Sequence, residues 1–183
     1  ATLVGFILVG RLAGLAQLGY LEAARTVSQP VVVFAVGFSS ALAPRTMEAV
    51  ADRNTDSQER LIRLGSRLCM AFGLFYALAA GWDHALNPMS QLVPKAYVVP
   101  GLVVLLVAGS SLRGAIRPLV AALLAKGRTR PMAGVDFVAS LLLILACALA
   151  GRVGVFSYAT GFLILGIIRQ FQYQRLAFKE SND

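Results

Sequence analysis

Two arginines and a serine within one apolar segment are the residues of this sequence best placed to bind a charged ligand. The segment reads AGSSLRGAIRPLVAALL and carries Ser110, Arg113 and Arg117. In an α-helix, residues three or four apart lie on the same face, so the two guanidinium groups would form one stripe with Ser110 a turn away. Guanidinium groups bind phosphate in a bidentate manner. The spacing therefore favours a site for a phosphate-containing anion.

The surroundings of this arginine pair leave two interpretations open. The expected helix over 95–126 contains no acidic residue to neutralise the charges. A charge at bilayer depth costs about 3 kcal/mol or more unless it faces water or a partner. Either the helix continues past Pro118 and the arginines line a hydrated cavity, or it ends near Ser111 and they lie at the membrane interface.

The composition indicates that this chain is embedded in a lipid bilayer. Of its 183 residues, 57% are hydrophobic and 14% are charged; typical globular chains have about 45–50% and about 25%. The mean hydropathy of +0.71 agrees. A soluble protein of this length needs more polar surface, so we expect a membrane protein.

Continuous apolar runs, without the alternation of a β-strand, favour membrane-spanning helices over a membrane barrel. Uncharged stretches cover 26–44, 68–82, 96–112, 137–151 and 153–168. We therefore predict an all-α polytopic bundle of about six transmembrane helices within residues 1–172, followed by a cytoplasmic tail over 173–183. The expected helices are 1–13, 19–47, 62–82, 95–126, 132–150 and 153–172. The first is expected to be truncated, because the chain starts inside an apolar run without a methionine.

Positive charge is distributed unevenly between alternate ends of these helices. One side carries eleven cations: Arg45, Arg53, Arg60, Arg63, Arg67, Lys126, Arg128, Arg130, Arg169, Arg175 and Lys179. The other carries four, namely Arg11, Arg25, Lys95 and Arg152. The positive-inside rule makes the first side cytoplasmic and places the C-terminus there.

Helix 19–47 carries a second polar stripe of Glu22, Arg25 and Gln29. Glu22 and Arg25 could pair with each other in the outer leaflet, or they could form the outer mouth of the cavity. Pro30 removes a backbone donor and predicts a bend. Small residues farther along would permit close helix packing: Gly37, Ser39, Ser40 and Ala41.

Several other chemistries are disfavoured. Cys69 and Cys147 lie singly in apolar runs and are expected to be buried hydrophobes, and His84 has no partner at metal-ligand spacing. Asp136 could pair with Arg130 or serve as a proton or ion site. Because no phosphate loop, nucleophile elbow or catalytic carboxylate pair is present, we expect neither an enzyme nor a bound cofactor or metal. Nucleic acid is not an expected partner, since the cations lie between apolar runs.

The segment LGYLEAARTVSQPVVVFAVGFSSALAPRTMEAVAD carries a family resemblance. It is similar to the region of helices 7 and 8 in the polysaccharide-biosynthesis lipid flippases, the O-antigen translocases of the MATE-like multidrug/oligosaccharidyl-lipid/polysaccharide exporter superfamily. LLAKGRTRP resembles its cytoplasmic Gly-Arg turn between helices 10 and 11, and GRVGVFSYATGFLILG the start of its last core helix. The resemblance covers nearly the whole chain, with half of the family's twelve or more helices missing.

This resemblance implies the C-terminal lobe of a two-lobe transporter in the bacterial inner membrane. An N-terminal lobe of the same protein would face it across a central cavity, and the pair would flip a polyprenyl-pyrophosphate-linked oligosaccharide by alternating access. Arg113 and Arg117 would hold the pyrophosphate, with Arg25 and Ser110 as further contacts. The expected partners are this lipid-linked glycan, membrane lipids and the missing lobe.

Two rival functions make different demands on acidic residues. A MATE-type cation or drug antiporter needs a carboxylate deep in the lobe, whereas the deep charges here are basic. A membrane-embedded glycosyltransferase or polymerase needs a catalytic carboxylate at an interface, for which only Glu48, Asp52, Asp83 and Asp136 are candidates.

Overall fold

The protein is a bundle of α-helices in the computed structural model, which describes residues 2–52, 54–82, 93–97 and 99–178. In chain order the elements are α1 (Thr2–Leu12), α2 (Leu15–Ala51), α3 (Thr55–Trp82), the 3-10 turn η1 (Lys95–Tyr97), α5 (Pro100–Ala125), α6 (Thr129–Val153) and α7 (Phe156–Phe178). Within these ranges no strand is present. The predicted all-α class is confirmed.

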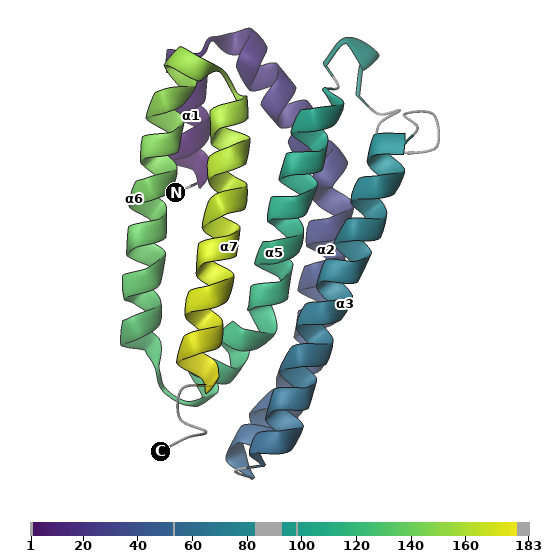
Figure 1. The fold of residues 1–183 in the computed structure, drawn as a ribbon, viewed down its shortest axis with the longest axis vertical. Helices are drawn as coiled ribbons and strands as arrows, with labels where there is room; N and C mark the ends of the chain where they lie inside the picture. Colours follow the sequence, from purple (N-terminus) through teal and green to yellow (C-terminus); the bar gives the residue numbers. More distant parts are fainter. Residues whose placement is uncertain (1, 53, 83–92, 98, 179–183) are drawn as a thin grey trace.

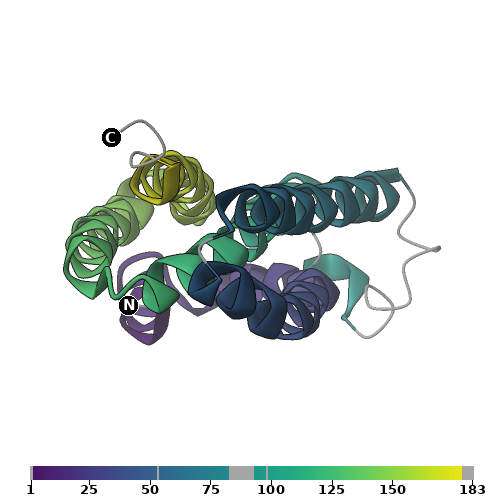
Figure 2. The ribbon, with the colours of Figure 1, turned by 90° about the horizontal axis from the view of Figure 1, so that it is seen from below.

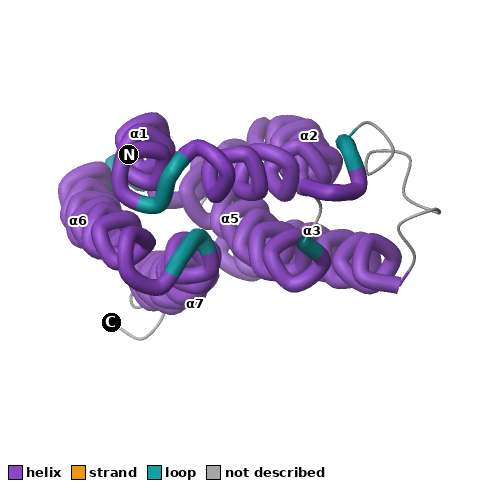
Figure 3. The backbone as a smooth tube through the Cα atoms, turned by 90° about the horizontal axis from the view of Figure 1, so that it is seen from above, coloured by secondary structure: helices purple, strands orange, loops and turns teal. Residues whose placement is uncertain are grey.

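Helix α5 is the centre of the bundle. It packs against α2 and α3 on one side and against α7 on the other, while α6 packs on α7 and α1 on α6. Viewed from below, α2 and α3 form one group and α6 and α7 another, with α5 running between them (Figure 2). The view from above shows the same division, with α1 beside α6 (Figure 3). Helix α5 therefore holds the two groups of helices together.

The helix ends follow the alternation expected from the charges. The α2–α3 and α5–α6 connections and the end of α7 lie at the lower pole of Figure 1, whereas the α1–α2 and α6–α7 turns lie at the upper pole. The lower pole thus gathers the cation-rich loops. Of the cations assigned to this side of the membrane, Arg53 and Lys179 lie outside the described residues, and so does His84.

The structure extends four of the expected helices, namely α2, α3, α6 and α7, whereas α5 begins only at Pro100 and not at residue 95. Helix α2 passes through Pro44 and ends only at Ala51, and α7 continues to Phe178, so the first part of the predicted tail is helical. Helix α2 changes direction along its length (Figure 1), as its internal Pro30 predicts. Beside that proline, the Tyr76 hydroxyl of α3 donates a 2.7 Å hydrogen bond to the backbone carbonyl of Val27.

Close packing of α5 depends on glycines facing it and within it. A Cβ atom on Gly73 of α3 would lie 1.7 Å from the Ser111 Oγ, and one on Gly114 would lie 2.5 Å from the Cβ of Ala35 in α2. The small residues of α2 were expected to permit close helix packing. Gly37 is not needed for it, because a Cβ atom there would meet nothing within 4 Å. Helix α5 itself supplies part of the close contact.

The outer surface of the bundle is strongly apolar. Large hydrophobic side chains are exposed on several helices, among them Leu74, Phe75 and Leu78 of α3 and Phe137, Leu141 and Leu145 of α6. In the candidate span Thr129–Ala150, only 22% of the apolar window is buried. A water-soluble protein would not expose so much apolar area. This surface suits contact with lipid.

Four helices are long and apolar enough to cross a membrane: Leu15–Ala51, Thr55–Ala79, Pro100–Ala125 and Thr129–Ala150. The sequence predicted about six. Helix α1 has 11 residues, fewer than the roughly 20 that a span needs, and the second half of α7 contains Arg169, Gln170 and Arg175. The chain is accordingly a multi-pass helical membrane bundle.

Candidate functional site: a cationic cavity beside α5

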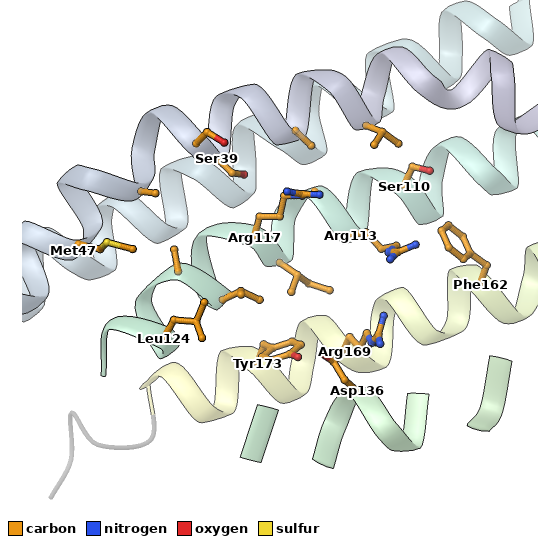
Figure 4. A pocket seen from close by; sticks show the side chains of 18 residues that line it. Ser39, Met47, Ser110, Arg113, Arg117, Leu124, Asp136, Phe162, Arg169 and Tyr173 are labelled. Carbon is orange, nitrogen blue, oxygen red and sulfur yellow. Dashed lines mark ion pairs between the residues drawn. The ribbon is translucent and has the colours of Figure 1, made fainter. Parts of the chain in front are cut away.

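A cavity of about 520 Å³ lies beside α5, between α2 and α7. Figure 4 shows α2 on one side of it, α7 on the other and α5 between them. The lining side chains are Val32, Ala35, Ser39, Ser40, Ala43 and Met47 of α2; Ser110, Arg113, Gly114, Ile116, Arg117, Val120, Ala121 and Leu124 of α5; Asp136 of α6; and Phe162, Arg169 and Tyr173 of α7. Its wall is thus largely apolar, with a few charged groups.

The two arginines singled out in the sequence line this cavity together with Ser110. Helix α5 runs without a break through Arg113, Arg117 and Pro118 to Ala125. The interpretation in which the helix ends near Ser111 is therefore wrong. The spacing of four residues places both guanidinium groups on the side of α5 that faces the cavity (Figure 4).

An aromatic ring holds the first of these arginines. The Cζ atom of Arg113 lies 5.3 Å from the centroid of the Phe162 ring on α7. This distance is within the range of a cation–π interaction, in which the negative face of the ring attracts the cation. Phe162 also lines the cavity. The contact fixes one guanidinium group between α5 and α7.

A third arginine and an aspartate complete the charged lining. The Arg169 Nη2 atom of α7 lies 2.9 Å from the Asp136 Oδ1 atom of α6, and Tyr173 lies close to the same carboxylate (Figure 4). Of the two roles considered for Asp136, pairing with Arg130 is thus wrong, because its partner is Arg169. Arg169 had been assigned to the cytoplasmic surface, but it lies inside the cavity.

A signal for this pair was present in the sequence. In an antiparallel helical hairpin, residues at similar distances from the turn lie opposite each other. Asp136 and Arg169 are at similar distances from the α6–α7 turn at Gly154. Charge counting by loops missed the pair because it assigns each cation to the nearest helix end.

The cavity is cationic, because three arginines and one aspartate line it. It also contains an unused hydrogen-bonding group. Ser39 of α2 is 9% exposed, and its buried hydroxyl has no partner among the described residues. Ser39 and Ser40 both line the cavity. Within the described ranges, no three His, Cys, Asp or Glu side chains come together as metal ligands.

Arg25 lies apart from this cluster but in an adjoining space. A cavity of about 260 Å³ is lined by Arg25, Gln29 and Phe6, and it shares four lining residues with the first cavity: Val32, Ser110, Arg113 and Phe162. Arg25 also pairs with Glu22 at 3.4 Å and lies over the Phe6 ring at 5.0 Å. Glu22 and Arg25 therefore pair with each other, and Arg25, without Glu22, lines a space next to the arginine cavity.

Fold and site together define a multi-pass helical membrane protein with a cationic cavity between two groups of helices. Comparison with family models, with curated proteins and with solved structures finds no match to this chain. The flippase resemblance of the three sequence segments accordingly stays a prediction.

Proposed function

We propose that this chain is the C-terminal lobe of a transporter that flips a polyprenyl-pyrophosphate-linked oligosaccharide across the bacterial inner membrane. The observation that carries the proposal is the cavity lined by Arg113, Arg117 and Arg169 within an otherwise apolar bundle. Arginine is suited to phosphate groups, because its planar fork of N–H donors matches their oxygens. A buried cationic site beside lipid therefore suits a lipid with an anionic headgroup.

The arrangement of the helices supports the mechanism that we propose. The diphosphate would bind the arginines of α5 and α7, while the polyprenyl tail would remain among lipids along the apolar outer helices. Alternating access requires a second group of helices to rock against the first around a shared site. We propose an N-terminal lobe of the same protein as that second group, with the cation-rich pole in the cytoplasm.

The rival functions find less support in the site. A cation antiporter needs a carboxylate available to its substrate, and the carboxylate that lines the cavity, Asp136, is paired with Arg169. A glycosyltransferase or polymerase needs an acid or base beside its substrate, and the remaining lining residues are arginines, serines and apolar or aromatic side chains.

The test is complementation of a strain that lacks the full-length protein. We expect Arg113→Ala with Arg117→Ala to lower surface polysaccharide by about tenfold or more, because each lost charged hydrogen bond costs about 1.5–3 kcal/mol. The exposed Arg45 and Arg60 lie outside the cavity, so Arg45→Ala with Arg60→Ala is the matched control and should leave polysaccharide unchanged.

Two results would contradict the proposal. The first is normal surface polysaccharide in the Arg113/Arg117 variant at normal protein abundance. The second is drug sensitivity, with normal polysaccharide, when Asp136 is replaced by Asn, which would favour the antiporter instead.

A further inference from the structure

A carboxylate of the protein lies against one of the three cavity arginines. Asp136 Oδ1 is 2.9 Å from Arg169 Nη2, and both side chains line the cavity that also contains Arg113 and Arg117. Carboxylate and phosphate oxygens accept hydrogen bonds from the same guanidinium N–H groups. Asp136 therefore pairs with an arginine, Arg169, that an anionic ligand could also bind.

We infer that Arg169 is the third anion-binding arginine of the cavity and that Asp136 is an internal competitor, which a bound diphosphate group displaces. The inference rests on the proposed function, because that function assigns a diphosphate to this cavity. It adds a ligand-binding residue on α7 and a built-in means of release, since Asp136 returns to Arg169 when the ligand leaves.

The exposure of the two partners supports this exchange. The Asp136 side chain is 53% exposed, whereas the Arg169 side chain is 21% exposed. Asp136 also lies within the first eight residues of α6 (Thr129–Val153), near the cation-rich pole, so the displaced carboxylate remains close to the membrane interface. The arginine cannot leave the cavity for solvent as easily, and an unpaired buried cation is unfavourable. Arg169 thus exchanges one anionic partner, the Asp136 carboxylate, for another, the diphosphate.

The positions of the other donors also support it. Arg113 and Arg169 together line a small space of about 60 Å³ where α5, α6 and α7 meet. Figure 4 shows both side chains reaching into the space between α5 and α7, with Ser39 of α2 across the cavity from Arg117. The Ser39 hydroxyl is buried and lacks a partner among the described residues. A diphosphate has enough oxygens to accept from donors on all three helices.

The experiment measures binding of inorganic pyrophosphate to the intact protein in nanodiscs by calorimetry at constant ionic strength. We expect Asp136→Asn to tighten binding by about fivefold or more, the lower end of typical coupling between sites. Glu48→Gln is the matched control, because it removes one exposed carboxylate near the same pole without touching the cavity. It should leave the affinity unchanged.

A double-mutant cycle tests whether Asp136 acts through Arg169. We expect Arg169→Gln to weaken pyrophosphate binding and to abolish the gain from Asp136→Asn. An equal gain in the Arg169→Gln background, or no gain from Asp136→Asn alone, overturns the inference. The proposed function has a separate criterion: pyrophosphate binds the wild-type protein, and Arg113→Ala with Arg117→Ala abolishes that binding. If this criterion is met, the proposed function stands even when the exchange between Asp136 and Arg169 is overturned.

A second arm distinguishes the two sources of the phosphate group. The same variants are titrated with nanodiscs that contain a polyprenyl diphosphate. A gain from Asp136→Asn in both arms supports the exchange on a lipid headgroup. A gain with inorganic pyrophosphate alone supports the exchange but contradicts the proposed function, and binding of neither probe by any variant contradicts both.

Discussion

The guanidinium carbon of Arg113 lies 5.3 Å from the centroid of the Phe162 ring, and this contact links α5 to α7 at the edge of the cavity. We expect Phe162→Leu to lower the free energy of unfolding in detergent by about 0.5–2 kcal/mol beyond the loss of packing, the usual range for a cation–π contact. The additional loss should vanish in an Arg113→Gln background and persist in an Arg117→Gln background. Equal losses in both backgrounds would show that the ring contributes packing alone.

A second prediction concerns the contact between α3 and α5. A Cβ atom on Gly73 would lie 1.7 Å from the Ser111 Oγ, and Ser111 is held in place by its 2.7 Å hydrogen bond to the Val107 carbonyl. Gly73→Ala should therefore lower the free energy of unfolding by about 1–3 kcal/mol, as overpacking does. Gly37→Ala is the control, because nothing lies within 4 Å of its Cβ position. It should be neutral or stabilising, and an equal loss there would contradict the packing argument.

A third prediction tests whether the surface of α6 faces lipid. Leu145 is 58% exposed. In a bilayer, Leu145→Lys should reduce the amount of inserted protein, because a charge at the middle of a span costs about 3 kcal/mol. Leu145→Met should have little effect. Membrane fractionation and immunoblotting measure the outcome, and improved solubility of the lysine variant would instead indicate a water-facing surface.

A fourth prediction concerns the water in the cavity. In a background with Cys69→Ala and Cys147→Ala, which removes both buried thiols, Ser40→Cys should react with a hydrophilic thiol reagent in membrane vesicles, because Ser40 is exposed and lines the cavity. Leu141→Cys, also exposed but on the apolar face of α6, should stay unlabelled, since a lipid-facing thiol does not meet the reagent. Equal labelling at both positions would contradict a bilayer-embedded bundle.

The helices themselves could be predicted well from the sequence. Each apolar run became a helix, and the expected range 62–82 lies within α3 (Thr55–Trp82). The bounds moved outward where the residues favour a helix but not the membrane interior. Helix α2 continues past the expected end at residue 47 to Ala51, and α7 continues past residue 172 to Phe178. Hydropathy detects the apolar, membrane-embedded part of a helix and misses polar turns that extend beyond it.

The candidate site was predicted in part. Arg113, Arg117 and Ser110 were found because a helical period places them on one face, and that relation needs only the positions of residues in one helix. Arg169 and Phe162 were missed because they reach the cavity from α7. Asp136 was given the wrong partner, since a charge near a helix end can pair along its own helix or with the helix packed beside it.

The sequence by itself determined that this chain is an α-helical membrane protein, which helix ends carry the positive charge, and which face of α5 is charged. These properties depend on composition and on spacing along one helix, and such local preferences act before any helix meets another. Only the tertiary structure decided that α7 faces α2 across α5, that Arg169 enters the cavity, and that Asp136 pairs with it. Those outcomes depend on how each helix is rotated about its axis, which is set by packing such as that of Gly73 against Ser111.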